Sequence, residues 1–317
     1  MSAAAGADRW VGIDIGGTSV KAGALRADGT ILEELGFDPG FARGPAHALD
    51  SIAEHARRLA APGSLRALGV GVPGLLRRAD GFVMSSPNIK GFKDLPLRAE
   101  LARRLGLAPE RVVVENDANA AALGEQWLGA ARGRSDLLMV TLGTGIGGGL
   151  ILDGKLYAGG GLGGEVGHIV VDPRGLPCGC GARGCVETLA SATAARRRAI
   201  EAGLPKDSPG DLKLLCDIAR RGPGPERSLL FEIGVDLGRG LGPVLCLLDI
   251  NVFVFGGGFS AALDLLDLGI RQGADERSYG GRGGGLELLR ATLGPAAGWI
   301  GAARPIVPSR PVAAARS

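Results

Sequence analysis

Apolar and polar residues alternate along the first third of the chain in runs that predict several strands and then a helix. Residues 10–25 form two apolar runs separated by Gly16 and Gly17, which predicts two strands joined by a tight turn. Residues 31–35 follow an Asp-Gly turn and predict a third strand. Apolar positions recur at helical spacing over residues 45–59, so we expect an amphipathic helix there.

Strands and helices continue to alternate up to about residue 118. A buried strand is predicted within residues 65–76, a helix within 95–106, a strand at 111–117 and a helix after it. This order is typical of an α/β domain. We therefore expect a first domain over residues 1–118.

The second half of the chain repeats this plan in outline. Residues 135–156 predict a strand, a glycine turn and a hairpin, and residues 245–263 predict a buried strand, a glycine turn and the start of a helix. Two related halves indicate a duplicated architecture of two α/β domains with a cleft between them. The second domain is expected over residues 119–297.

Composition and charge narrow the class of protein. A hydrophobic content of 45% and a charged content of 22% are typical of globular proteins, and the net charge of +3 gives no argument for nucleic acid or membrane as a partner. The first ten residues lack the basic start and the apolar core of a signal peptide. We therefore expect a cytoplasmic protein that binds neither nucleic acid nor membrane.

Two glycine turns carry candidate phosphate-binding chemistry. The segments "DIGGTSVK" (14–21) and "LGTGIGGG" (142–149) each place small residues and a threonine between two predicted strands. Such turns expose backbone N–H groups that can hold phosphate oxygens, although most glycine turns only connect hairpin strands. Neither segment fits the P-loop pattern. With a third glycine turn at 256–258, they indicate a nucleotide site.

The segment "VENDANAAA" brings four polar groups to the end of a predicted strand. They are Glu115, Asn116, Asp117 and Asn119. One Asp or Asn is enough to cap the alanine-rich helix that follows, and capping alone is the alternative interpretation. Since the carboxyl ends of strands are where α/β proteins place ligands, the surplus favours Asp117 as a catalytic residue.

Three of the five cysteines lie within eight residues, in "CGCGARGC". An odd number cannot form a disulfide framework, and Zn²⁺ prefers four nitrogen or sulfur ligands. His168, Cys178, Cys180 and Cys185 supply such a set, with buried free thiols as the alternative. The closed ligand set predicts a structural zinc site, and Cys216 and Cys246 are expected in the core.

Six segments together resemble the sugar kinases of the ROK family (repressor, open reading frame, kinase), and most of all its bacterial glucokinases. They are "GIDIGGTSVKAG", "GVPGLL", "SSPNIKGFKDLPL", "ENDANAAALGE", "TLGTGIGGGLILDGKLYAGGGLGGEVGH" and "CGCGARGCVET". The resemblance covers nearly the whole chain. It implies an actin-like ATPase (ribonuclease H-like) fold in which sugar and ATP meet in the interdomain cleft. The segment after Gly298 would return as a helix to the first domain.

The resemblance also implies roles for individual residues. The catalytic base falls on Asp117. The sugar-binding positions are Asn88, Asn116, Asp117, Glu165, His168 and Glu187. The ATP-binding positions are Asp14, Gly16, Gly17, Thr18, Lys21, Thr144, Gly145, Gly147, Gly257 and Gly258. Asp14 would lie near Mg²⁺, Lys21 has no assigned role, and His168 would bind zinc with one ring nitrogen and a sugar hydroxyl with the other. A side chain at Gly145 is expected to weaken ATP binding with little effect on sugar binding.

The implied reaction transfers the γ-phosphoryl group of ATP, with Mg²⁺, to the primary hydroxyl of a hexose. Glucose is the first expectation, and a homodimer or homotetramer is the expected assembly. The alternatives are a kinase for fructose, mannose, N-acetylglucosamine or N-acetylmannosamine, and a sugar-sensing regulator without catalysis. Family regulators carry a helix-turn-helix domain before the first glycine turn, where this chain has about ten residues. The chain also departs from the family pattern on the adenine side, where Pro295 stands at the start of a usual Asn-Asp pair.

Overall fold

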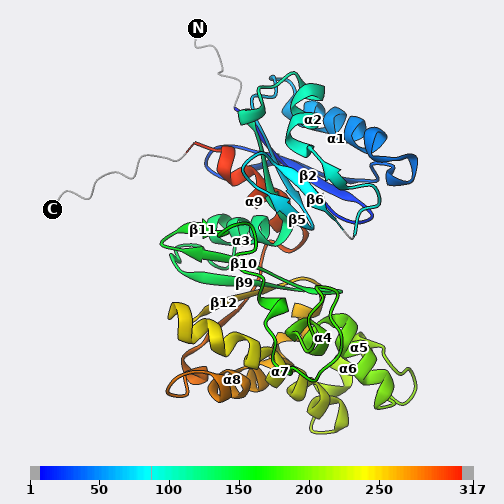
Figure 1. Ribbon diagram of the computed structural model, residues 1–317, viewed down its shortest axis with the longest axis vertical. Helices are drawn as coiled ribbons and strands as arrows, with labels where there is room; N and C mark the ends of the chain where they lie inside the picture. Colours follow the sequence, from blue (N-terminus) through cyan, green and yellow to red (C-terminus); the bar gives the residue numbers. More distant parts are fainter. Residues whose placement is uncertain (1–7, 87, 309–317) are drawn as a thin grey trace, which may run out of the picture. The chain divides into compact units, whose positions relative to one another are not determined.

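Each half of the chain is built around a five-stranded sheet, and the two sheets share one strand plan (Figure 1). The computed structural model describes residues 8–86 and 88–308. The first sheet has the order β3 (Ile31–Phe37), β2 (Val20–Leu25), β1 (Trp10–Ile15), β4 (Leu68–Val72) and β8 (Val112–Asn116). The second has the order β11 (Lys155–Tyr157), β10 (Ile146–Leu152), β9 (Leu137–Leu142), β12 (Val252–Gly256) and β13 (Glu287–Arg290).

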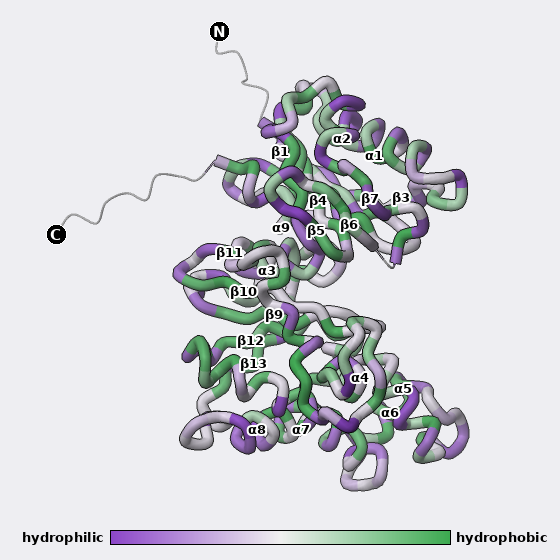
Figure 2. Tube along the Cα trace, viewed as in Figure 1, coloured by the Kyte–Doolittle hydropathy of each residue, from purple (hydrophilic) through white to green (hydrophobic). Residues whose placement is uncertain are grey.

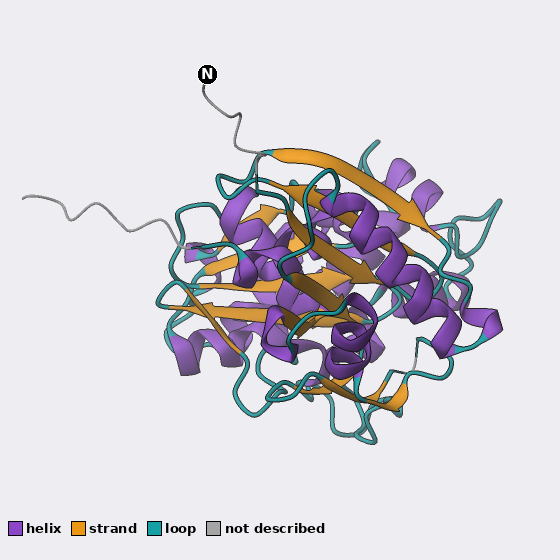
Figure 3. Ribbon diagram, turned by 90° about the horizontal axis from the view of Figure 1, so that it is seen from above, coloured by secondary structure: helices purple, strands orange, loops and turns teal. Residues whose placement is uncertain are grey.

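The pairing directions also agree between the two sheets. In each, an antiparallel three-stranded segment is extended by two parallel strands, which start from β1 in the first sheet and from β9 in the second. Helices pack against the strands (Figure 3). The duplicated α/β architecture predicted from the sequence is therefore confirmed.

The first unit comprises Met1–Gly129 and Pro295–Ser317. Its helices are α1 (Pro45–Ala60), α2 (Leu97–Leu105), α3 (Asp117–Leu128) and α9 (Ala297–Ala303). A small sheet of β5 (Leu75–Arg77), β6 (Phe82–Ser85) and β7 (Lys93–Leu95) lies between β4 and α2 in the chain. The apolar side chains of β1 join those of α1 and α2 in one core.

The opposite face of this sheet is shaped for helix α9. Gly12 on β1 is paired with Gly23 on β2 and with Gly69 on β4, so three glycines form one row across the sheet. A Cβ atom at Gly12 or Gly69 would lie 1.9 or 1.8 Å from a backbone oxygen of α9. The row therefore lets the backbone of the C-terminal helix (red in Figure 1) lie directly on the strands.

The second unit comprises Ala130–Gly294. Its helices are α4 (Val186–Ala190), α5 (Ala192–Glu201), α6 (Leu212–Ala219), α7 (Pro225–Leu248) and α8 (Leu263–Arg277). Strands β9 and β12 are hydrophobic (green in Figure 2) and almost entirely buried, as is typical of strands covered on both faces. Leu241 of α7, Ile270 of α8 and Phe255 of β12 are fully buried in the shared core.

The division between the units differs from the expected boundary at residue 118. Helix α3 groups with the first unit up to Gly129, because it packs closely on α9. A Cβ at Gly301 of α9 would lie 1.6 Å from the carbonyl oxygen of Ala120 in α3. The C-terminal segment enters the first unit at Pro295, a few residues before the expected position.

One of the two predicted core cysteines is not in the core. Cys216 in α6 is buried, but Cys246 in α7 is exposed, as is its neighbour Leu247. The apolar sequence near the end of α7 suggested burial, yet only Leu245 of this trio faces inward. The prediction for Cys246 is therefore wrong, because hydrophobicity alone does not identify the buried face of a helix.

Among the described helices, none combines the length and the apolar sequence that a bilayer-spanning segment requires.

The contact between α3 and α9 gives a stability prediction. Gly301→Ala should lower the melting temperature by roughly 2–12 °C, because overpacking a tight contact costs about 1–3 kcal/mol, which outweighs the better helix propensity of alanine. Gly284→Ala is the control, since a Cβ there meets no atom within 4 Å. Differential scanning calorimetry checks both variants, and equal melting temperatures would contradict the packing described for α9.

Candidate active site

The turn between β1 and β2 is tight and largely exposed. The N–H of Gly16 donates to the carbonyl of Ser19 at 2.9 Å, and Gly17, Thr18 and Ser19 lie on the surface. A Cβ at Gly17 would lie 2.8 Å from the carbonyl oxygen of Asn88. The first phosphate turn and the predicted sugar residue Asn88 therefore lie side by side within the first unit.

Asp14 lies at the end of β1, beside this turn. A Cβ at Gly298 of α9 would lie 2.4 Å from Asp14 Oδ2, so the carboxyl group is backed by the C-terminal helix. The pKa of Asp14 is raised to about 7, mainly by burial and also by the charge of Asp117, against the opposing effect of Lys21. A carboxyl group that ionises reluctantly and faces a second carboxylate is suited to bind a hard cation such as Mg²⁺.

Asp117 is the first residue of α3, directly after the end of β8. Asn116 caps the helix, because its side-chain oxygen accepts hydrogen bonds from the N–H groups of Ala118 and Asn119 at 2.9 and 3.2 Å. Burial raises the pKa of Asp117, while hydrogen bonds from backbone N–H groups and from Asn116 lower it. Capping is thus performed by Asn116, which leaves the half-buried carboxylate of Asp117 available for chemistry.

The other two polar groups of this segment are buried and contact each other. Glu115 and Asn119 are each 3% exposed, and Asn119 Nδ2 donates to Glu115 Oε1 at 2.9 Å. The surplus of polar groups that favoured Asp117 in the sequence is therefore smaller than four, because Glu115 and Asn119 bond to each other. These two side chains connect the end of β8 to the start of α3 beneath the surface.

The second phosphate turn, between β9 and β10, is already in contact with a predicted sugar residue. The N–H of Ile146 donates to Glu187 Oε2 at 2.9 Å, and that of Gly147 donates to Thr141 Oγ1 at 3.1 Å. A Cβ at Gly145 would lie 2.3 Å from Glu187 Oε2. The expectation that a side chain at Gly145 would leave sugar binding unchanged does not fit this contact, because that side chain would displace Glu187.

The third glycine turn is held against the second. Gly257 has a φ of +79°, and a Cβ there would lie 2.3 Å from the carbonyl oxygen of Leu142. Gly258 begins the short 3-10 helix η4 (Gly258–Ala262), and a Cβ there would meet no atom within 4 Å. Ser260, which the sequence interpretation did not single out, is buried and donates to the carbonyl of Gly257 at 2.7 Å.

Four predicted metal ligands converge in the second unit. His168 ends the 3-10 helix η3 (Val166–His168), Cys178 and Cys180 belong to the following loop, and Cys185 precedes α4. The four ligand atoms all lie within 4.8 Å of one another. The distances from Cys178 Sγ to His168 Nδ1 and from Cys180 Sγ to Cys185 Sγ are both 3.6 Å.

These distances fit a tetrahedral metal ion. With a metal–sulfur bond of about 2.3 Å and a metal–nitrogen bond of about 2.0–2.1 Å, two thiolates lie about 3.8 Å apart and a thiolate and imidazole about 3.6 Å apart. His168 turns Nδ1 to the cysteines, and its Nε2 lies 4.0 Å from Glu165 Oε2. The second ring nitrogen therefore faces the predicted sugar residue Glu165.

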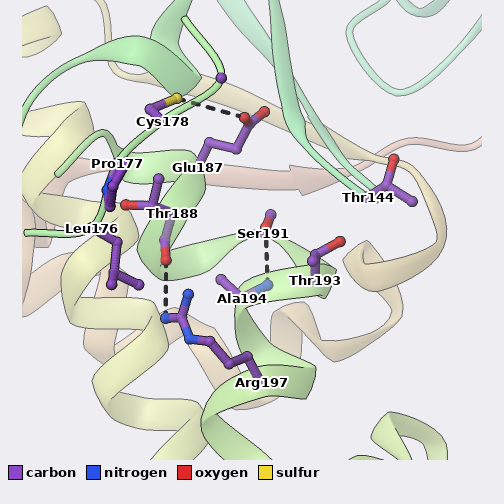
Figure 4. A pocket seen from close by; sticks show the side chains of 11 residues that line it. Thr144, Leu176, Pro177, Cys178, Glu187, Thr188, Ser191, Thr193, Ala194 and Arg197 are labelled. Carbon is purple, nitrogen blue, oxygen red and sulfur yellow. Dashed lines mark hydrogen bonds between the residues drawn. The ribbon is translucent and has the colours of Figure 1, made fainter. Parts of the chain in front are cut away.

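A pocket of about 380 Å³ lies between the metal loop and helix α5 (Figure 4). Its lining includes Cys178, Glu187, Thr144, Ser191 and Arg197. The Arg197 guanidinium donates to the carbonyl of Thr188 at 3.1 Å. Arg197 is one of three consecutive arginines in α5, and no pattern in the sequence distinguishes it as a pocket residue.

The elevated pKa of Asp14 gives a pH prediction. Because the folded-state pKa of about 7 lies above the ordinary value of 3.8, Asp14 reduces stability progressively as pH rises from about 4 through 7. Without nucleotide and metal, Asp14→Asn should raise the melting temperature by roughly 5 °C at pH 8 and by much less at pH 5. Thermal unfolding at the two pH values tests this, and a pH-independent difference would contradict the assigned pKa.

Comparison with known proteins identifies the family. The sequence pattern of the ROK family matches residues 10–306. A glucokinase from Thermotoga maritima is 36% identical over 307 residues, which cover 92% of this chain and 95% of the relative. The crystal structure of a ROK hexokinase from Thermus thermophilus is similar with a TM-score of 0.78 and 34% identity, and covers 93% of this chain and 96% of its own.

A ROK glucokinase from Streptomyces griseus, solved with glucose and AMPPNP, is similar with a TM-score of 0.76 and 35% identity. The match covers 93% of this chain and 98% of that structure. The predicted actin-like ATPase fold is confirmed by these neighbours together with the two sheets of common plan. The chain belongs to the ROK family.

Proposed function

We propose that this protein is an ATP-dependent hexose kinase that converts glucose to glucose 6-phosphate. The observation that carries the proposal is the half-buried carboxylate of Asp117, which begins α3 beside Asn116 and whose charge acts on Asp14, the residue at the end of β1 before the first glycine turn. The relatives support glucose and ATP as the substrates. The Thermotoga maritima protein bears the name glucokinase, and the Streptomyces griseus structure contains glucose and an ATP analogue.

Asp117 acts as the general base in the proposed reaction. It accepts the proton of the sugar's primary hydroxyl while the oxygen attacks the γ-phosphorus of ATP, and ADP leaves. Burial raises its pKa toward that of an effective base at neutral pH. Asn116 remains the helix cap and keeps the carboxylate at the start of α3.

The donor phosphates are proposed to lie along the glycine turns. Four backbone N–H groups in these turns donate no hydrogen bond within the described residues, so they can donate to phosphate oxygens. They belong to Gly17, Thr18, Thr144 and Gly145. Gly147 is an exception, since its N–H already donates to Thr141. Gly257 and Gly258 are proposed to contact the adenosine. Asp14 would hold Mg²⁺, which neutralises phosphate charge when bound, and no separate role is assigned to Lys21.

The sugar is proposed to bind Asn88, Asn116, Asp117, Glu165, His168 and Glu187. The two carboxylate oxygens of Glu187 have different neighbours. One accepts a hydrogen bond from the Ile146 N–H, and the other lies 3.9 Å from Cys178 Sγ. This contact supports a direct link between the sugar side and the donor turn. The preference for glucose over other hexoses belongs to this proposal and follows the named relatives.

The Cys/His cluster is proposed to hold one structural Zn²⁺. Its three thiolates and one imidazole leave no open position for a substrate, so the ion orders the loop between Glu165 and Glu187. A homodimer or homotetramer, a cytoplasmic location and the absence of nucleic-acid or membrane partners stay predictions of the sequence.

Removal of the proposed base tests the reaction. Asp117→Asn should lower kcat by at least about a hundredfold, since general-base catalysis contributes about 10²–10⁴-fold, and should leave glucose binding largely intact. Asp211→Asn is a matched control, because Asp211 caps α6 and asparagine caps equally well. Steady-state kinetics and calorimetric titration with glucose measure the two effects. Near wild-type turnover in Asp117→Asn would refute the assignment.

Loss of one thiolate tests the metal site. Cys180→Ser should lose zinc and weaken glucose binding by about 10–100-fold, while nucleotide binding to the turns persists. Elemental analysis of the wild type should find about one zinc per chain. Cys246→Ser, outside the cluster and exposed, should keep both zinc and affinity. A metal-free protein with full activity would overturn the proposal.

A further inference from the structure

Glu115 is a buried carboxylate directly before the proposed catalytic segment. It is 3% exposed and lies on β8, one residue before Asn116 and two before Asp117. A buried charge is tolerated only where it is paired and its oxygens accept hydrogen bonds. The partners of Glu115 therefore determine where this strand end can lie.

The cation that pairs with Glu115 is Arg78. Its Nε lies 3.1 and 2.9 Å from the two carboxylate oxygens, and a terminal nitrogen lies 2.5 Å from Oε2. This is the bidentate geometry that only arginine provides. The turn that carries Arg78 is itself fixed, because Arg98 of α2 donates to the carbonyls of Arg78 and Ala79 at 3.0 and 2.7 Å.

Two further hydrogen bonds extend from Glu115 into the start of α3. Oε1 accepts from the N–H of Asn116 at 3.0 Å and from Nδ2 of Asn119 at 2.9 Å. A carboxylate only accepts, so Asn119 must point its NH₂ group inward. Its own Oδ1 is then buried without a partner among the described residues. The contact with Glu115 therefore sets the orientation of the Asn119 amide at the start of α3.

The ion pair connects two segments that carry proposed sugar-binding residues. Arg78 follows β5, in the hairpin that continues through β6 to Asn88, whereas Glu115 leads to Asn116 and Asp117. We propose that Arg78 is a positioning residue for phosphoryl transfer: through Glu115 it fixes Asp117 relative to Asn88 and thereby to the bound sugar. This inference rests on the proposed kinase function and adds a residue that the sequence motifs do not contain.

The test is Arg78→Met, which keeps an apolar stem and removes the guanidinium. We expect kcat/KM for glucose to fall by about 10–100-fold, because small displacements of reacting groups cost up to about a hundredfold, with KM for ATP changed less than twofold. Arg78→Lys should recover part of the loss, since lysine restores the charge without the fork. Arg77→Met is the matched control, because Arg77 pairs with Asp80 in the same hairpin and both side chains are more than half exposed.

A second variant keeps the test informative if Arg78→Met does not fold. Arg78→Met combined with Glu115→Gln leaves no unpaired buried charge, and it should fold yet remain slow with glucose. A purely structural role predicts a lower melting temperature with unchanged kcat per folded molecule. That result in either folded variant, measured well below its melting temperature, would overturn the inference. Wild-type turnover and an inert Asp117→Asn establish the kinase function separately, so failure of one proposal is distinguishable from failure of the other.

Discussion

The part of the candidate site in the second unit depends on the spacing of four metal-ligand atoms, which belong to His168, Cys178, Cys180 and Cys185. Segment 169–185 is glycine-rich, and its regular pairing within the described chain consists of two isolated β-bridges, Val170 with Cys185 and Pro177 with Arg183. The side chains of His168, Cys178, Cys180 and Cys185 bring both ends of this segment together, since their four ligand atoms all lie within 4.8 Å of one another. Because Cys185 precedes α4, the cluster also fixes Glu187, whose carboxylate then reaches the N–H of Ile146 on the glycine turn.

A buried carboxylate provides the equivalent constraint in the first unit. Glu115 fixes the end of β8 and the start of α3 from inside, and Arg78 compensates its charge. Asp117 can therefore be half-buried at a helix N-terminus without having to cap it, because Asn116 does so. In each unit, a side chain that is not proposed to contact substrate positions one that is: Cys185 positions Glu187, and Glu115 positions Asp117. Fixed geometry of this kind is what general-base catalysis requires.

Local patterns predicted much of this arrangement. Alternation of apolar residues placed the strands, the glycine turns separated them, and an odd number of clustered cysteines pointed to a metal site that the ligand distances fit. The missed features depend on pairs distant in sequence. Arg78 and Glu115 are 37 residues apart, and Ile146 and Glu187 are 41 apart. The division of the units after Gly129 differs from the expected residue 118 for the same reason, since α3 packs with a helix near the opposite end of the chain. Hydrophobic periodicity is analysed over short stretches of sequence, so it cannot predict contacts between residues this far apart.

The most direct test of the account is whether ADP formation depends on sugar. Purified protein with ATP and Mg²⁺ should release ADP in step with glucose 6-phosphate when glucose is present, and very slowly without it. A panel of fructose, mannose, N-acetylglucosamine and N-acetylmannosamine should show glucose as the preferred acceptor by kcat/KM. Glucose binding with no ADP release would contradict the account and favour a sugar sensor. Preference for another hexose would keep the chemistry and overturn the assigned substrate.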